Sequence, residues 1–286
     1  MKKIVVIGAT GMLGKPVTHQ LILAGMEVTI LCRDPKKAKE EFQGCKIVKG
    51  DLGDLSSLEA AFEGNEAVYL SLHVQPGSKA GDWQAEREGL QNVISASRKT
   101  GIQCIGYLSS LVKDYQGQNG FSWWMFDVKQ QAVNSIKNSG IPFLLFYPSS
   151  FMENLHNGFK MGKRLSTVGV SDVKKFWIAG SDYGRQVACA FEGFRSSQEY
   201  VIQGLEGYTD EEAVAIFAKH YSRENLSVGK IPIGMLKFMG LFNEKMSYGS
   251  RILEALNRYP ETFQADQTWA DLGKPTVTIE AYAQGL

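Results

Sequence analysis

Short apolar runs alternate with segments of helical periodicity through the first half of the chain. Residues 4–7 form a β-branched run, and apolar side chains then recur at helical spacing from Leu13 to Leu21, before Gly25. This pattern predicts a strand, a glycine-rich turn and a helix that ends in a left-handed glycine. Further strands are predicted at 28–31, 47–48, 67–72, 102–108 and 143–147, with helix-like segments that close on Gly64, Gly101 and Gly140.

This alternation predicts a doubly wound α/β fold. Short apolar strands separated by helices form a parallel sheet that is covered on both faces, with right-handed crossovers. We therefore expect a Rossmann domain over residues 1–153. In such sheets the ligand lies across the carboxyl ends of the strands where strand order reverses, so functional residues should follow strands.

The pattern is less regular after residue 153. Residues 154–286 are expected to form a smaller α+β cap region, with some elements returning to the main sheet. The predicted elements are a helix over 183–194 capped by Asp182, a strand over 200–202, and a helix over 213–221 opened by a Thr209–Glu212 capping box. A substrate pocket is expected between the two parts, since ligand sites are common at such junctions.

Composition argues against several classes of function. The 286 residues are 44% hydrophobic and 21% charged, the profile of a soluble globular protein. Lysine plus arginine number 31 against 30 acids, so the charge predicts no nucleic-acid partner and no membrane surface. The four cysteines are scattered and the four histidines lack ligand spacing, so no metal is expected. No apolar stretch reaches the roughly 18 residues of a membrane span, and MKKIVVIG lacks a signal-peptide pattern, so a cytoplasmic location is expected.

The first turn, Gly8-Ala9-Thr10-Gly11-Met12-Leu13-Gly14, is the strongest candidate for a binding motif. It has one residue more between its first two glycines than GxGxxG, but glycines here still let backbone amides approach a pyrophosphate at a helix N-terminus. A tight connection without a ligand is the alternative. Because a strand precedes the turn and an amphipathic helix follows it, we predict dinucleotide binding. The predicted contacts are Gly8, Thr10, Gly11, Met12, Leu13 and Gly14.

Arg33 follows the second predicted strand, where an NAD-preferring site carries a carboxylate for the ribose hydroxyls. A guanidinium suits a 2′-phosphate, so the sequence favours NADP(H) over NAD(H), with a solvent-facing arginine as the alternative. Asp34, followed by Pro35, is better explained as the cap of the next helix. Further cofactor contacts are predicted where the third and fourth strands end. They are Asp51, which also suits a turn, Leu52, Ser71 and Leu72.

The order and spacing of these motifs resemble the NmrA-like family, an atypical branch of the short-chain dehydrogenase/reductase superfamily. The resemblance covers nearly the whole chain. It rests on Gly8 to Gly14, Arg33-Asp34-Pro35, Gly50-Asp51, Tyr107-Leu108-Ser109-Ser110, Lys129, Pro148 to Asn154, Asp182 to Arg185, and Phe263 to Tyr282.

The resemblance implies a role for Lys129. In the classical superfamily, a tyrosine four residues before this lysine donates a proton, while the lysine lowers the pKa of that tyrosine and holds the nicotinamide ribose. Position 125 is a methionine, which can neither give nor take a proton. Lys129 is therefore expected to be a cofactor ligand, with a solvated helix lysine as the alternative. Ser109 or Ser110, where the classical serine lies, is the candidate for holding a substrate oxygen.

Aromatic residues are abundant around these candidates. Tyr107, Tyr115, Tyr147 and Tyr183 are candidates to replace the missing acid, but buried tyrosines near strand ends are more often packing residues. Pro148 and Phe151 resemble the wall that the family builds around the nicotinamide, although a proline also simply ends a strand. The apolar stretch 233–242 suits a lid or a subunit contact.

Two classes of function fit this sequence. The first is an NADPH-dependent reductase of a small apolar or aromatic acceptor such as a quinone, a reaction that does not require the missing tyrosine. The second, which the resemblance also implies, is a non-enzymatic NADP(H) sensor that regulates a protein partner. Sugar epimerisation is weaker, because it normally needs the tyrosine as base. A homodimer is compatible with either class, and open space beside the nicotinamide would favour the reductase.

Overall fold

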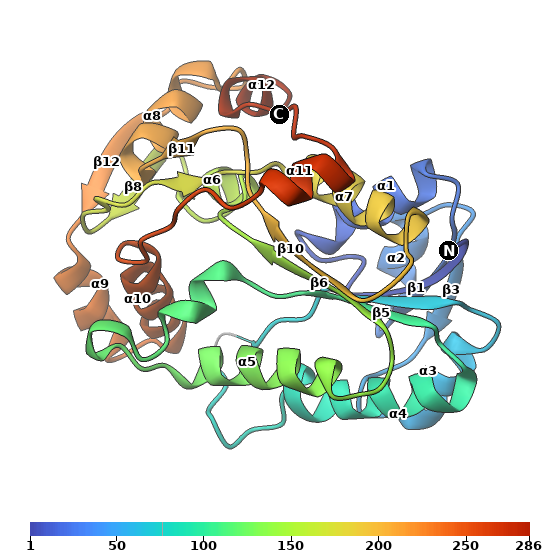
Figure 1. The fold of residues 1–286 in the computed structure, drawn as a ribbon. Coiled ribbons are helices and arrows are strands. Elements are labelled where there is room, and N and C mark those ends of the chain that lie inside the picture. The colour runs from blue at the N-terminus through green and yellow to red at the C-terminus, as the bar shows by residue number, and fades with distance from the viewer. Residues whose placement is uncertain (76) are drawn as a thin grey trace.

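The centre of the molecule is a seven-stranded parallel sheet, seen in a computed structural model that describes residues 1–75 and 77–286 (Figure 1). The strands lie in the order β10-β6-β5-β4-β1-β2-β3. Strand order reverses at β1, which pairs with β2 on one side and with β4 on the other. The predicted doubly wound α/β fold is thereby confirmed. The strands are β1 Lys3–Ile7, β2 Glu27–Cys32, β3 Lys46–Lys49, β4 Ala67–Leu70, β5 Cys104–Leu108, β6 Phe143–Pro148 and β10 Gln198–Ile202.

Helices cover both faces of this sheet. α1, α2, α7 and α11 bury their apolar side chains on one face, and α3, α4 and α5 bury theirs on the other (Figure 1). These helices are α1 Gly14–Leu23, α2 Pro35–Glu41, α3 Leu55–Phe62, α4 Leu90–Thr100, α5 Trp124–Lys137, α7 Gly180–Glu192 and α11 Asp266–Leu272. A π-helical turn, η1 Ala85–Gly89, leads into α4, and two 3₁₀ turns, η2 Leu111–Tyr115 and η3 Gln118–Gly120, lead into α5.

Local capping sets where two helices begin. Asp34 accepts a hydrogen bond from the Lys36 amide at 3.0 Å, in front of α2. Thr209 and Glu212 form the predicted capping box of α8 (Asp210–His220), with the Glu212 carboxylate accepting from the Thr209 amide at 2.9 Å. Both predictions are confirmed. The caps were predictable from the sequence because each depends only on residues that are close together in the chain.

The prediction that Asp182 caps a helix is wrong. α7 begins at Gly180, so Asp182 lies inside its first turn. The buried Asp182 carboxylate instead accepts hydrogen bonds from the Thr276 and Val277 amides, both at 2.8 Å. It therefore fastens the C-terminal segment to α7.

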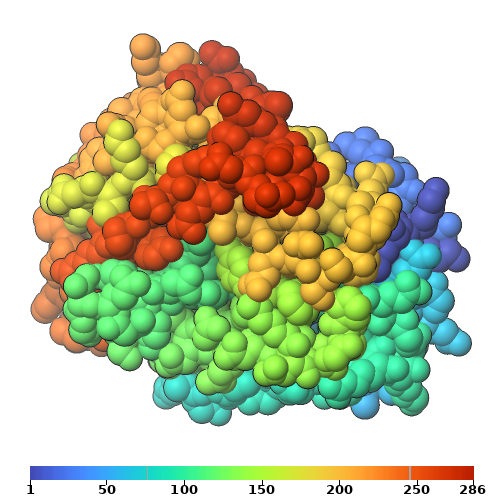
Figure 2. Space-filling view, in the orientation of Figure 1, coloured from blue at the N-terminus to red at the C-terminus, as the bar shows by residue number. Residues whose placement is uncertain are grey.

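The C-terminal part of the chain also forms a smaller α+β cap at the carboxyl ends of the central strands. The orange to red atoms of the C-terminal segments run from the left edge over the top of the molecule in Figure 2, and the red ones reach its upper centre. The cap contains a three-stranded and a two-stranded sheet, whose strands are β7 Lys160–Met161, β8 Arg164–Val168, β12 Ser227–Ile231, β9 Lys175–Phe176 and β11 Gly207–Tyr208. Its helices are α6 Glu153–Asn157, α8 Asp210–His220, α9 Ile233–Gly240, α10 Glu244–Leu256 and α12 Ile279–Gln284.

Two kinds of feature do not occur in the part of the chain that the structure describes. None of its helices is long and apolar enough to cross a lipid bilayer. Its histidine, cysteine and carboxylate side chains form no group of three or more with the arrangement of a metal site.

A buried tyrosine pair joins α7 to the sheet. Tyr69 on β4 and Tyr183 on α7 are both fully buried, and their hydroxyl groups share a hydrogen bond of 2.8 Å. Phe146 on β6 and Phe191 on α7 surround the pair with edge-on or tilted ring contacts. The two hydroxyl groups satisfy each other in an otherwise apolar layer.

Replacing Tyr183 alone with phenylalanine is expected to lower the free energy of unfolding by about 1–3 kcal/mol, because the Tyr69 hydroxyl loses its partner. The double variant Tyr69→Phe/Tyr183→Phe is the matched control. It should regain most of that loss, since no polar atom is left unpaired. Urea denaturation of the three proteins measures the difference, and a double variant less stable than Tyr183→Phe would contradict this account.

Candidate active site

The turn between β1 and α1 is closed too tightly for any residue but glycine at two positions. Gly8 has φ +89°, and a Cβ on it would lie 2.3 Å from the Ser71 carbonyl oxygen. A Cβ on Gly14 would lie 2.0 Å from the Gly8 carbonyl oxygen. No side chain caps the N-terminus of α1. The Lys15 amide already donates to the Gly11 carbonyl oxygen at 3.0 Å and Pro16 has no N–H, so the amides that could bind an anion such as a phosphate are those of the turn directly before α1.

A cavity of about 350 Å³ opens at the carboxyl ends of β1, β2, β3 and β4. Its position at the reversal of strand order is the one expected for the ligand of such a fold. Of the predicted cofactor contacts, Gly8, Thr10, Arg33, Asp51, Leu52, Ser71 and Leu72 line it. One wall is completed by residues that follow β4, namely His73, Gln75, Ser78, Trp83, Gln84 and Ala85.

Arg33 lies exposed in the wall of this cavity. Its guanidinium makes no hydrogen bond or ion pair to any residue that the structure describes. Asp34 is occupied as the cap of α2, and Asp51 accepts a hydrogen bond from the Gly53 amide at 2.8 Å. The cavity therefore presents an unpaired cation beside two acids that already have backbone partners.

Lys129 on α5 is bound to a buried carboxylate that the sequence did not indicate. Its ammonium donates a hydrogen bond to Glu86 Oε1 at 2.8 Å, and the Tyr107 hydroxyl donates to the same oxygen at 2.6 Å. Glu86 is completely buried, whereas the Lys129 side chain is 21% exposed. The second oxygen, Glu86 Oε2, is buried without a hydrogen-bond partner among the described residues. Lys129 is thus a paired lysine and not a solvated one.

His73, which lines the cavity at the ends of β1 to β4, connects this ion pair electrostatically to that cavity. Desolvation lowers the pKa of the His73 imidazole, the negative charge of Glu86 acts in the opposite direction, and the positive charges of Lys129 and Arg33 lower it further. His73 and Arg33, which line the cavity, therefore share one electrostatic environment with Glu86 and Lys129, which lie behind its wall.

An apolar cluster fills the space between the start of α5 and α10. Met125, which occupies the position of the classical tyrosine, is buried in this cluster. Trp123 packs edge-on against Phe126 and against Tyr248 of α10, with ring centroids 5.3 Å apart in each pair. Burial raises the pKa of the Tyr248 hydroxyl, and the negative charge of Glu86 raises it further.

The cavity at the carboxyl ends of β5 and β6 is much smaller, at about 20 Å³. That volume holds about one water molecule. Pro148 lines it together with Ser110, while Ser109 is buried with its hydroxyl unpartnered within the described residues. Phe151 packs edge-on against Tyr183 in the core.

The four tyrosines considered from the sequence are buried. Tyr107 binds Glu86, Tyr183 binds Tyr69, and the Tyr147 hydroxyl donates to Glu199 at 2.7 Å. Burial raises the pKa of each of these three hydroxyl groups. Tyr115 packs against Phe121.

Sequence reasoning missed Glu86, His73 and Tyr248. A single glutamate in a polar stretch carries no periodic or motif signal, and its burial depends on β5 and α5, which lie at least 18 residues further along the chain. Tyr248 approaches from the cap, so no local pattern connects it with Glu86.

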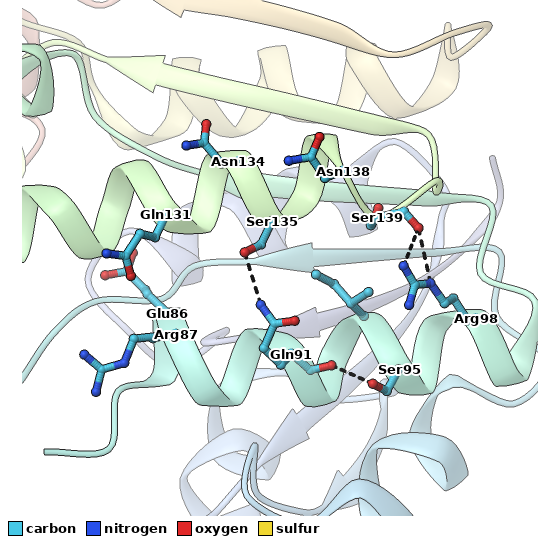
Figure 3. Close-up of a pocket in the computed structure, with 11 residues that line it drawn as sticks. Glu86, Arg87, Gln91, Ser95, Arg98, Gln131, Asn134, Ser135, Asn138 and Ser139 are labelled. Atoms are coloured by element: carbon cyan, nitrogen blue, oxygen red, sulfur yellow. Dashed lines mark hydrogen bonds between the residues drawn. The ribbon is translucent and has the colours of Figure 1, made fainter. Parts of the chain in front are cut away.

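A separate polar groove of about 480 Å³ lies between α4 and α5 (Figure 3). Gln91 donates to the Ser135 hydroxyl at 3.1 Å, and Arg98 donates twice to the Ser139 carbonyl oxygen. Glu86 and Arg87 lie together at one end of the groove in Figure 3. Gln91 and Arg98, whose side chains cross the groove, thus find their hydrogen-bond acceptors on α5 and just after it.

Comparison with known proteins agrees with the resemblance found in the sequence. The family model described as NmrA-like family matches residues 1–281. An uncharacterised chloroplastic protein of Arabidopsis thaliana is 29% identical over 174 residues, which are 55% of this chain and 62% of that protein. Quinone oxidoreductase 2 of Escherichia coli is 27% identical over 229 residues, covering 77% of this chain and 75% of that protein.

Solved structures share the fold over the full chain. An NADPH-dependent quinone oxidoreductase of Escherichia coli, complexed with NADPH, superposes with a TM-score of 0.72 at 22% identity, covering 99% of both chains. The triphenylmethane reductase of a Citrobacter species, complexed with NADP(H), gives a TM-score of 0.74 at 18% identity, covering 99% of this chain and 100% of that one.

His73 offers a direct probe of the Glu86 charge. Glu86→Gln is expected to lower the pKa of His73, because it removes the anion that opposes the effects of desolvation, Lys129 and Arg33. Titration of the His73 ring protons by NMR measures this shift. Glu63→Gln, an exposed substitution at the end of α3, is the control and should leave the His73 titration unchanged. A His73 pKa that rises in Glu86→Gln would show that the charges are arranged differently.

Proposed function

Because the chain belongs to the NmrA-like family, we propose that it is an NADP(H)-binding reductase that transfers hydride from NADPH to a small apolar acceptor such as a quinone. Residues 1–153 hold most of the cofactor site in this proposal, and residues 154–286 contribute the cap. The observation that carries it is the unpaired Arg33 guanidinium in the wall of the cavity beside the glycine turn.

The residues along the cavity suit NADP(H). The amides of the turn from Gly8 to Gly14 would hold the pyrophosphate, since the glycines expose the backbone at the start of α1. Arg33 would pair with the 2′-phosphate and would thereby favour NADP(H) over NAD(H). Asp51 and Leu52 would border the adenine, and Ser71 and Leu72 would border the middle of the cofactor. Lys129 would bind the hydroxyls of the nicotinamide ribose.

NADPH, when bound, would supply the hydride that the acceptor takes up. The chain supplies position and surroundings: Lys129 orients the ribose, and the apolar cluster around Met125 excludes water from the neighbouring space. A quinone that takes up a hydride delocalises the negative charge over its ring, and solvent then provides the proton. Because solvent can provide the proton, the reaction needs no acid at position 125, and a methionine there is compatible with catalysis.

The named activities of two relatives support a reductase. One is called a quinone oxidoreductase, and its solved counterpart is described as NADPH-dependent. The other is called a triphenylmethane reductase and was solved with NADP(H). Both names describe reduction of an acceptor with aromatic or conjugated rings.

The filled space near β5 and β6 favours a second candidate, an NADP(H) sensor. A cavity of about 20 Å³ at these strand ends does not admit an aromatic ring, and α10 closes the apolar cluster through Tyr248. In a sensor, cofactor occupancy would shift the cap and thereby alter the binding of a partner protein. In a reductase, α10 must move away from Trp123 before an acceptor can enter.

Arg33→Met is expected to weaken NADPH binding about 10- to 100-fold, because it removes charge-assisted hydrogen bonds to the 2′-phosphate. NADH affinity should change little. Lys36→Met, which removes an exposed cation three residues away, is the matched control and should leave both affinities as they are. Fluorescence titration with the two nucleotides measures this, and an equal loss for NADPH and NADH would contradict the role of Arg33.

Oxidation of NADPH across a panel of quinones and small carbonyl compounds distinguishes the two candidates. The reductase proposal expects turnover with quinones that survives replacement of Tyr107, Tyr115, Tyr147 or Tyr183 by phenylalanine in any variant that still binds NADPH. Tight NADPH binding without turnover on any acceptor would instead support the sensor. Binding has to be measured on the same preparation, so that inactivity is not confused with loss of cofactor.

A further inference from the structure

Glu86 is held by two donors that meet on one of its oxygens. Lys129 Nζ and the Tyr107 hydroxyl both bind Oε1, at 2.8 and 2.6 Å. Oε2 is buried and has no hydrogen-bond partner within the described ranges 1–75 and 77–286. Lys129 is therefore the cation that compensates this carboxylate, and Tyr107 adds only a neutral hydrogen bond.

Leaving this carboxylate without its cation would be costly. An ionised carboxylate that is removed from water carries a desolvation penalty of several kcal/mol, and loss of its partner leaves that penalty uncompensated. The Lys129 ammonium is consequently fixed at Glu86. An ammonium has three donor hydrogens, and the Glu86 bond uses one, so the remaining two can bind a ligand while the ion pair stays intact.

The chain places Glu86 by an irregular turn that also builds the cofactor cavity. Glu86 lies in the π-helical turn η1, directly after Gln84 and Ala85, which line that cavity. Gly89 closes the turn, and a Cβ on it would lie 3.0 Å from Leu52 Cβ and 3.1 Å from the Trp83 ring. π-helical turns are rare and occur frequently at functional sites. The position of the carboxylate is therefore fixed by the same packing that shapes the wall of the cavity.

We propose that Glu86 is the residue that positions Lys129 for the cofactor, in place of the tyrosine that is absent at position 125. This inference rests on the proposed NADP(H) function and deepens it. Met125 has no group that can orient an ammonium, whereas Glu86, held in η1, accepts a hydrogen bond from Lys129 Nζ at 2.8 Å. Glu86 acts through Lys129 and is a positioning residue.

The test compares two ligands that differ at the nicotinamide end. NADPH reaches Lys129 in the proposed site, whereas adenosine 2′,5′-bisphosphate has the adenine and the 2′-phosphate but lacks the nicotinamide ribose. Glu86→Gln keeps the shape of the side chain and removes its charge, and is expected to weaken NADPH binding about tenfold. Binding of adenosine 2′,5′-bisphosphate should stay unchanged, because Arg33 and the glycine turn are unaltered.

A double-variant cycle separates positioning from a merely structural role. In a Lys129→Met background, Glu86→Gln should cause no further loss of NADPH affinity, since the residue through which Glu86 acts has gone. Tyr107→Phe is the matched control: it removes the other hydrogen bond to the same oxygen, leaves the ion pair in place, and should preserve NADPH affinity. Glu86→Asp, which withdraws the carboxylate by one methylene, provides a second variant should Glu86→Gln fail to fold, and should show the same selective loss.

Three results would overturn the inference. Glu86→Gln could lose affinity equally for both ligands, or it could still lower NADPH affinity in the Lys129→Met background. Alternatively, Lys129→Met could weaken NADPH binding while Glu86→Gln leaves it unchanged. Failure of the proposed function looks different. In that case the unmodified protein does not bind NADPH, or Lys129→Met binds it as tightly as the unmodified chain.

Discussion

The close approach of the β1 turn to the end of β4 governs the arrangement of the whole site. The Ser71 carbonyl oxygen occupies the space that a side chain at position 8 would need. The β1 turn therefore lies directly against the end of β4, and residues after β4 on both sides of position 76, among them His73 and Gln84, line the cavity beside it. Arg33 lines this cavity, whereas Lys129 and Glu86 lie outside its lining and influence His73 through their charges.

The first half of the fold was predictable from the sequence because its signals are local. Glycine turns, the Asp34 cap and the apolar strands each depend on residues within a few positions. Asp182 was misassigned because its partners, Thr276 and Val277, lie 94 and 95 residues away. In the site, Gly8 and Arg33 follow strands and were found from that position, whereas Glu86 required knowledge of a burial that only tertiary packing creates.

The two candidate functions share the cofactor end of the molecule and differ at the cap. A buried carboxylate that keeps Lys129 in place is useful to a reductase, which needs a fixed ribose, and equally to a sensor, which needs selective occupancy. The two functions differ in what a movement of α10, and of its Tyr248, away from Trp123 would allow to bind. In a reductase it would be a small acceptor, and in a sensor a partner protein. The cap is therefore the part of the molecule in which relatives with one fold can diverge in function.

The position of α7 bears on how the chain folds as it leaves the ribosome. Six of the seven central strands are complete by Pro148, but Tyr183 and Phe191, which cover Tyr69 and Phe146, are synthesised later. Until then one apolar face of the nascent sheet is only partly covered, by α1 and α2, and the edge of β6 awaits β10. A nascent chain that has emerged only as far as β6 exposes this face and this edge, a kind of surface that favours aggregation or chaperone binding. The sheet is complete only after β10 has emerged, and α11 adds the last cover to this face.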